Sequence, residues 1–219
     1  MSSIAASGSK RPALGALRRL MNREPQKRAG EVCEICAQPI GEEHSHVVNT
    51  ETRNLLCACR ACTLLFTNEG AARGKFRAVP DRHLYDPGFA LGESQWDGFQ
   101  IPVRIAFFFF NSSLEKVVAF YPSPAGATES MLALDAWEDL ARANPILESL
   151  QPDVEALLVY GRRGEAFQCF IVPIDACYEL TGVVKRTWKG FDGGEAAWAA
   201  IEGFFARLRE RSRNLRAVS

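Results

Sequence analysis

The sequence predicts an α+β protein, in which a small four-cysteine metal-binding module of the treble-clef or zinc-ribbon kind precedes an α+β domain. We expect that domain to have a mainly antiparallel sheet and two or three helices. Two observations support the prediction. Five of the seven cysteines lie between positions 33 and 62, and the chain after position 103 contains short apolar runs of strand length beside helix-periodic segments. A length of 219 residues suits one mid-sized domain plus a small one.

Residues 1–30 form a basic N-terminal arm, with seven basic side chains against one acidic one. The first nine residues are small and polar, and we expect them to be disordered. Leucines at positions 14, 17 and 20 with Met21 place a narrow apolar stripe on a short amphipathic helix over 12–24. The prediction is therefore a partly disordered arm containing one short helix.

Residues 31–78 form the predicted metal-binding module. Cys33-x-x-Cys36 and Cys59-x-x-Cys62 are each spaced like a metal knuckle, and 22 residues separate the two pairs. Two such knuckles complete a tetrahedral thiolate shell. Cys57 has no partner at the right offset. We therefore expect Cys33, Cys36, Cys59 and Cys62 to be the metal ligands and Cys57 to be a spare thiol.

Zinc is the expected metal, because it is borderline-soft, redox-inert and accepts tetrahedral geometry. A rubredoxin-like iron site is the alternative. Rubredoxin knuckles usually have glycine after the second cysteine, whereas this chain has Ala37 and Thr63 there. Disulfides would need an oxidising compartment, and no signal-like segment indicates export.

His44 and His46 lie between the knuckles, so either histidine, or Cys57, is an alternate ligand in place of a cysteine. A nuclease of the HNH type also has histidine on a hairpin between Cys-x-x-Cys pairs, with Asn-Leu before the second pair, as at Asn54 here. That class commonly needs another histidine after the last cysteine, where Thr63 stands. We therefore favour a solvated or supporting role for the two histidines.

Within the module we expect a hairpin with strands at 46–49 and 53–56, followed by a helix beginning near 63. That order is typical of a treble-clef finger. Residues 79–102 have no period and form a predicted long loop, which is either functional or wraps an adjoining surface. His83 lies there with Asp81 and Asp86, and a surface position is the simpler interpretation of it.

Residues 103–219 form the predicted α+β domain. The continuous apolar run at 105–110 indicates a strand covered on both faces. Asp135 and Asp192 each open a helix with a capping box, and Pro145 ends the first helix. In the second helix a stripe of Trp198, Ile201, Phe205 and Leu208 should face the core. In all, strands are expected at 103–110, which contains this apolar run, and at 116–121, 156–160, 166–172 and 180–188.

The chain has no nucleophile elbow, phosphate loop or dinucleotide fingerprint, so we do not expect an enzyme. The longest apolar run is far shorter than a membrane span, and we expect a cytoplasmic protein with reduced or metal-bound thiols. Cys169 and Cys177 should be inert buried thiols. A formal net charge of zero argues against nucleic acid as the partner, although the basic arm keeps a nucleic-acid-binding zinc finger as an alternative.

Four stretches of the chain resemble a known family: CEICAQPIGEEHSH from Cys33, LCACRACTLLF from Leu56, GKFRAVP from Gly74, and CYELTG from Cys177 through WKGFDGG. The family is an uncharacterised bacterial one encoded beside actinobacterial-type, high-affinity nickel–iron hydrogenases, and the resemblance covers roughly residues 30–206. It implies an accessory or adaptor role in hydrogenase maturation, with a hydrogenase subunit or maturation factor as the protein partner. An iron electron carrier serving the hydrogenase is the alternative role.

Overall fold

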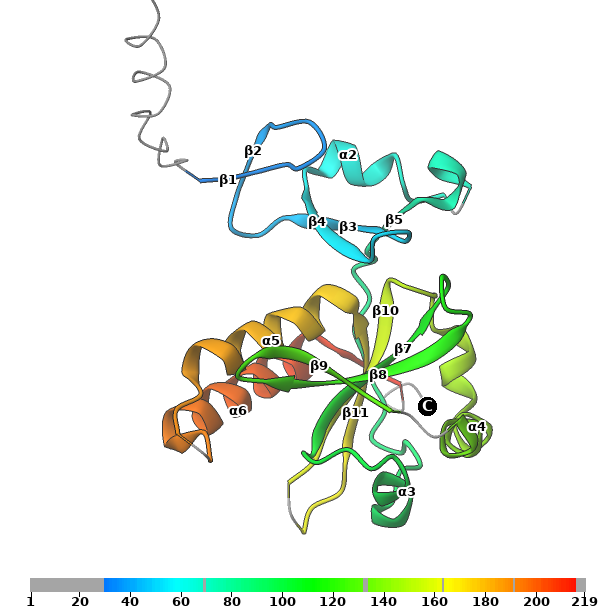
Figure 1. Cartoon of the computed structure of the whole chain (residues 1–219), viewed down its shortest axis with the longest axis vertical. Coiled ribbons are helices and arrows are strands. Elements are labelled where there is room, and N and C mark those ends of the chain that lie inside the picture. Colours follow the sequence, from blue (N-terminus) through cyan, green and yellow to red (C-terminus); the bar gives the residue numbers. More distant parts are fainter. Residues whose placement is uncertain (1–29, 69, 132–133, 163, 191, 216–219) are drawn as a thin grey trace, which may run out of the picture.

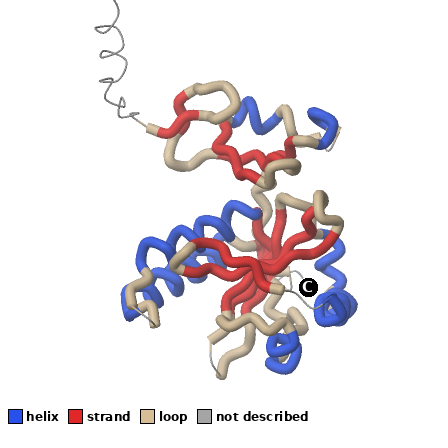
Figure 2. The backbone as a smooth tube through the Cα atoms, in the orientation of Figure 1, coloured by secondary structure: helices blue, strands red, loops and turns tan. Residues whose placement is uncertain are grey.

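The computed structural model describes residues 30–68, 70–131, 134–162, 164–190 and 192–215. A small cysteine-bearing module lies at one end of a larger body that contains a twisted sheet and several helices (Figure 1). The tube view shows the same division, with one strand-rich unit above the other (Figure 2). The basic arm and its predicted helix at 12–24 lie outside the described residues.

The module, residues 31–78, follows the order predicted from its sequence: knuckle, hairpin, knuckle, helix. A short pair of strands frames the first knuckle, and the hairpin gains a third strand to give the order β4-β3-β5. The helix was expected to begin near residue 63, but it begins at Arg60, inside the second knuckle. A helix in this place, instead of a strand, is the treble-clef arrangement. The elements are β1 (Glu31–Val32), β2 (Pro39–Ile40), β3 (Ser45–Asn49), β4 (Asn54–Ala58), α2 (Arg60–Leu64), the 3₁₀ turn η1 (Ala71–Gly74) and β5 (Phe76–Ala78).

The body is α+β, as predicted, with a seven-stranded sheet in the order β12-β6-β11-β10-β7-β8-β9. Every neighbouring pair in it is antiparallel except β12 with β6. Its strands are β6 (Leu84–Tyr85), β7 (Ile105–Asn111), β8 (Lys116–Ser123), β9 (Gly126–Ser130), β10 (Glu155–Tyr160), β11 (Gln168–Pro173) and β12 (Arg213–Asn214). Its helices are α3 (Glu93–Gly98), α4 (Leu134–Ala143), η2 (Pro145–Ser149), α5 (Ile174–Thr187) and α6 (Gly194–Arg211).

Helices cover both faces of this sheet (Figure 1). Alternate residues of a strand point to opposite faces, and in β10 Leu158 packs in the cluster built with α5 and α6, whereas Leu157 packs in the cluster with α3 and α4. Phe107 and Phe108 of β7 divide in the same way, and both are fully buried. The prediction of a strand covered on both faces is confirmed for residues 105–109, whereas Phe110 is 38% exposed.

Residues 180–188 were expected to form a strand, and this prediction is wrong. Residues 180–187 belong to helix α5, and Trp188 is its C-cap. The buried residues of this helix include Ile174, Cys177, Leu180 and Val184. Those positions recur every three or four residues, which is the helical period. The apolar residues from Leu180 onward cover only the second half of this helix, and so short a run also fits a buried strand.

The prediction of one long loop at 79–102 also needs correction. The segment contains β6, which pairs with β11, and the helix α3, which places Trp96 in the core. Neither element is long enough to show a period. Phe99, just after α3, is fully buried as well. The segment therefore wraps the body and completes its core.

Two expectations for helix α6 are also wrong. Helix α6 begins at Gly194 with Gly193 as its N-cap, so the Asp192 side chain does not cap it. Its buried stripe contains Phe204 as well as Phe205, while Trp198 is 43% exposed. Strand β9 is absent from the predicted strands. The preceding strand was expected to end at residue 121, whereas β8 continues to Ser123 before the chain turns into β9.

The module is fixed to the body through the hairpin. Val48 of β3 belongs to the body's own hydrophobic cluster, and Leu55 of β4 packs against it. The Ser113 hydroxyl donates a hydrogen bond of 2.7 Å to the Thr50 carbonyl at the hairpin turn. One face of the hairpin is thus committed to the body, which leaves the other face for the cysteines.

No helix in the described part of the chain is long and apolar enough to cross a membrane.

Candidate metal centre

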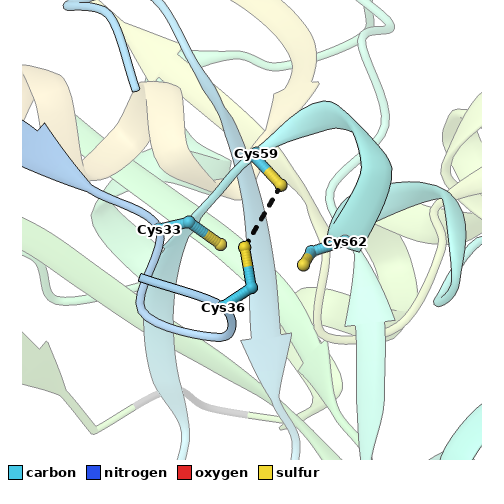
Figure 3. Close-up of side chains that lie close together, drawn as sticks. All are labelled: Cys33, Cys36, Cys59 and Cys62. Carbon is cyan, nitrogen blue, oxygen red and sulfur yellow. Dashed lines mark hydrogen bonds between the residues drawn. The ribbon is translucent and has the colours of Figure 1, made fainter. Parts of the chain in front are cut away.

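The structure brings the four predicted cysteine ligands together. Cys33 and Cys36 come from the loop between β1 and β2, Cys59 is the N-cap of α2, and Cys62 lies in its first turn (Figure 3). All four sulfurs lie within 4.8 Å of one another, and the Sγ atoms of Cys36 and Cys59 are 3.7 Å apart. A zinc–thiolate tetrahedron with bonds of about 2.3 Å has edges of about 3.8 Å. The cluster therefore fits one tetrahedral metal ion.

Local backbone geometry shapes the first knuckle. The Cys33 N–H donates to the Gln38 carbonyl and the Ala37 N–H donates to the Cys33 carbonyl, each at 2.8 Å. Ala37 has a φ of 61°, a left-handed conformation that favours glycine. This is the position where a rubredoxin knuckle usually has glycine. Ala37 adopts the required conformation at a cost of about 1 kcal/mol or more, so its identity does not exclude iron.

The second knuckle is helical. Thr63 lies inside α2, where its N–H donates to the Cys59 carbonyl at 3.0 Å and its hydroxyl to the same carbonyl at 3.2 Å. A helix N-terminus places backbone N–H groups and positive partial charge beside the thiolates. Thr63 is thus a helix residue and does not stand in for the nuclease histidine.

The thiols of Cys33 and Cys62 differ in acidity. Burial acts to raise the pKa of Cys33, but hydrogen bonds from the backbone N–H groups of Cys59, Cys36 and Ile35 outweigh it and lower that pKa to about 6. Burial, followed by hydrogen bonds with the neighbouring cysteine side chains and by the charge of Cys33, raises the pKa of Cys62 to about 12. A bound cation would oppose this effect, because cysteine thiols release their protons to solvent when they bind a metal ion as thiolates.

The spare thiol and the two histidines do not join this cluster. His44, His46 and Cys57 form a second group, with one ligand atom of each within 4.8 Å of the others. Burial and the nearby carboxylates of Glu34 and Glu31 raise the pKa of Cys57. The residues named from sequence as alternate ligands are therefore neighbours of one another.

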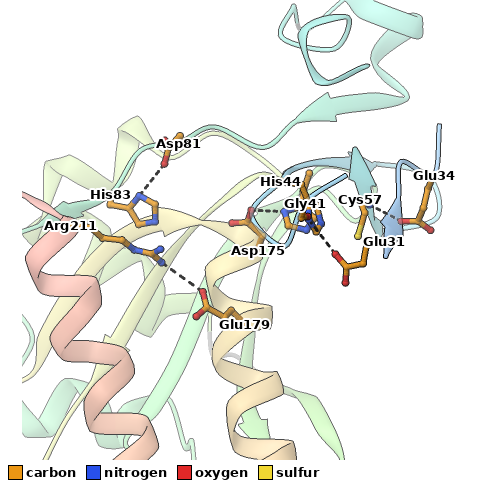
Figure 4. Close-up of polar contacts among 11 residues, drawn as sticks. Glu31, Glu34, Gly41, His44, Cys57, Asp81, His83, Asp175, Glu179 and Arg211 are labelled. Atoms are coloured by element: carbon orange, nitrogen blue, oxygen red, sulfur yellow. Dashed lines mark hydrogen bonds and ion pairs between the residues drawn. The ribbon is translucent and has the colours of Figure 1, made fainter. Parts of the chain in front are cut away.

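All three histidines of the chain line one cleft of about 750 Å³ between the hairpin and helices α5 and α6. His83 lies 3.5 Å from Asp81, measured from Nδ1 to Oδ1 (Figure 4). Burial, followed by the charge of Arg211, lowers the pKa of His83. Asp86 accepts a hydrogen bond from the Gly88 N–H in its own turn. His83 is thus a cleft residue that favours its neutral form.

Two supporting carboxylates were missed by sequence reasoning. The Cys57 N–H donates to Oε2 of Glu34 at 2.6 Å, which links the first knuckle to β4. Oδ2 of Asp175, in the first turn of α5, lies 2.8 Å from Nδ1 of His46 (Figure 4). Glu34 could have been suspected from its place inside the first Cys-x-x-Cys. Asp175 is 129 residues from its partner, and nothing local indicates it.

Cys169 and Cys177 lie in the body, 2% and 0% exposed, and the prediction that they are buried thiols is confirmed. Burial raises the pKa of both, so neither is a ready nucleophile.

The profile of a family of unknown function (DUF5947) matches residues 32–212. That span includes the tetrathiolate cluster, the histidine-lined cleft and every strand of the body's sheet except β12. No curated protein and no solved structure matches the chain.

Proposed function

The chain belongs to the family DUF5947, and we propose that it is a non-enzymatic, zinc-binding adaptor protein of the cytoplasm. Its partner would be a subunit or maturation factor of a nickel–iron hydrogenase, in whose assembly it would act. The resemblance of the cysteine-rich and C-terminal stretches to proteins encoded beside such hydrogenases supports the choice of partner. The geometry of the module supports the adaptor role.

The observation behind this proposal is the four-sulfur cluster of Cys33, Cys36, Cys59 and Cys62. Four thiolates fill the coordination shell of a tetrahedral ion and leave no position for a substrate. The module has fewer than fifty residues, so a bound metal would supply much of its folding free energy. We therefore propose that zinc at this site is structural and keeps the tip of the module rigid.

The tip presents apolar side chains to solvent. Ile35, between the first two cysteines, is 38% exposed, and Leu64 and Leu65 at the end of α2 are 60% and 65% exposed. These three residues flank the metal cluster, and we call them the tip leucine–isoleucine patch. Clustered apolar side chains that remain exposed are typical of protein-interaction sites. Burying them against a partner would release ordered water and favour association.

The test is co-purification of the tagged protein from cells that express the hydrogenase. We expect the wild type to recover a hydrogenase subunit or maturation factor, and Leu64→Asp with Leu65→Asp to lose it. Leu114→Asp is the matched control, because Leu114 is 43% exposed and lies on the body. Failure of the wild type to recover such a partner, together with normal hydrogenase activity in a deletion strain, would contradict the proposal.

Elemental analysis with a visible spectrum separates the zinc protein from the iron alternative. A colourless protein that contains zinc is expected. A red protein that bleaches on reduction would instead indicate a rubredoxin-like electron carrier.

A further inference from the structure

The hairpin β3–β4 has two chemically different faces. Val47 and Ala58 pack with Cys33 and Cys62 on the face toward the tetrathiolate cluster. His46 is adjacent to Val47 and pairs across the strands with Cys57, so both residues point to the opposite face. This second face is the one that carries Val48 into the body's core. The imidazole–thiol group therefore lies on the body side of the hairpin.

His44 lies two residues before His46 and completes a compact group on this face. The rings of His44 and His46 are 4.7 Å apart between centroids, and Cys57 adds its sulfur within the 4.8 Å limit of the group. Two imidazoles and one thiol at such distances match the ligand spacing of a single metal ion. Histidine and cysteine are both established ligands for a borderline transition-metal ion.

His44 supplies an independent sign that a ligand belongs here. Its Nδ1 lies 2.9 Å from the Gly41 carbonyl and 3.3 Å from Oε2 of Glu31. Its Nε2 is buried and has no hydrogen-bond partner among the described residues. The side chain is only 9% exposed. Leaving a buried polar atom unsatisfied costs about 1–3 kcal/mol, and a metal bond to Nε2 would remove that cost.

His46 is oriented in the way that metal-bound histidines usually are. Its Nδ1 meets Oδ2 of Asp175 at 2.8 Å, which leaves Nε2 as the nitrogen available to a ligand. A carboxylate behind a histidine fixes the ring and raises its basicity as a ligand. For His44, the Gly41 carbonyl takes the same role. Glu34, bonded to the Cys57 N–H, holds the backbone of the third residue and adds negative charge close by.

From this arrangement we infer a second metal site, in which Nε2 of His44, Nε2 of His46 and Sγ of Cys57 bind one divalent transition-metal ion of the zinc class. Three protein ligands leave a fourth coordination position open, as in catalytic and exchangeable zinc sites. His44 and His46 line the 750 Å³ cleft, so a small exchangeable ligand can approach from that side. The tetrathiolate site has no free coordination position, whereas the proposed second site has one.

The experiment is metal titration of the purified full-length protein, first stripped and then refilled, with Co²⁺ as the spectroscopic probe and Zn²⁺ as competitor. We expect the wild type to bind a second ion after the tetrathiolate site is full. Cys57→Ser and His44→Ala should each lose that second ion and keep the first. Retention of the first ion and of the circular dichroism spectrum shows that a variant has folded.

Asp175 is a positioning residue, and its variant sharpens the test. Asp175→Asn should weaken the second ion about 10–100-fold and alter its Co²⁺ d–d bands, while the charge-transfer bands of the tetrathiolate ion stay unchanged. Glu179→Gln is the matched control, because Glu179 lies on the same helix and lines the same cleft. A wild type that binds one ion only, or a second ion that persists in Cys57→Ser and His44→Ala, would overturn the inference.

Discussion

Replacing Arg82 by methionine should destabilise the folded protein more than any other single change to an ion pair in the described chain. Arg82 lies just after the module in the sequence, and its side chain contacts Glu155 at the start of β10. Its Nε donates to Oε1 at 2.7 Å, and its terminal nitrogen donates to Oε2 at 2.5 Å and to the Ser149 carbonyl at 2.8 Å. The pair therefore clamps the connecting segment onto the sheet.

The magnitude follows from the unequal burial of the two partners. Glu155 is fully buried, whereas the Arg82 side chain is 34% exposed. Arg82→Met would leave the Glu155 carboxylate in the core with only the Gln151 N–H, at 3.0 Å, as a partner. Stranding a buried charge costs about 3–5 kcal/mol. Water can enter from the exposed side of the vacated guanidinium position, so we expect the lower value of about 3 kcal/mol.

Urea unfolding of the metal-saturated protein measures this loss. With a slope of about 3 kcal/mol per molar urea, the midpoint should fall by about 1 M. The double variant Arg82→Met with Glu155→Leu should recover most of the loss, because it removes the stranded charge. Arg142→Met is the control: Arg142 and Asp139 also meet at 2.7 Å but are 73% and 65% exposed, so its effect should stay below about 1 kcal/mol. Equal losses for Arg82→Met and Arg142→Met would refute the reasoning.

Two further predictions concern the metal and the cleft. Removal of the metal by a chelator, or the substitution Cys59→Ser, should unfold the module while the body keeps its structure. The control Cys57→Ser should keep the tetrathiolate ion. Circular dichroism with metal analysis measures both effects, and a module that stays folded after chelation would contradict the prediction. The folded pKa of His83 is lowered, so the folded state binds fewer protons than the unfolded state between that pKa and the unfolded value of about 6.5. The free energy of unfolding should therefore decline as the pH falls from about 6.5 through the folded pKa, and then level off. Arg211→Gln removes a repulsive charge and should raise the pKa of His83, as followed by NMR of the imidazole; no change would show that burial alone sets it.

The strands that the sequence predicted correctly, and the grouping of the four cysteines, depend on local signals. The Cys-x-x-Cys spacings are set by the knuckle itself, and the runs at 105–109 and 156–160 are apolar because both faces of those strands are covered. Helix α5 was half missed because its apolar residues, such as Leu180 and Val184, also fit a short buried strand. Elements of two or three residues, such as β6 and β12, exist only through pairing with distant strands. No local pattern can indicate them.

The group of His44, His46 and Cys57 could have been predicted in part from the register of the hairpin. A four-residue turn after Asn49 fixes Asn49 opposite Asn54, and this register places His46 opposite Cys57. Period two then puts His44 on the same face. Sequence alone could therefore have separated Cys57 from the tetrathiolate cysteines and grouped it with both histidines. The sequence could not indicate Asp175, because this carboxylate lies on α5 and meets His46 only when the module packs against the body. The orientation of the His46 imidazole thus depends on the packing of the module against the body. When Arg82→Met weakens that packing, metal affinity at the histidine–cysteine site should fall before metal affinity at the tetrathiolate site does.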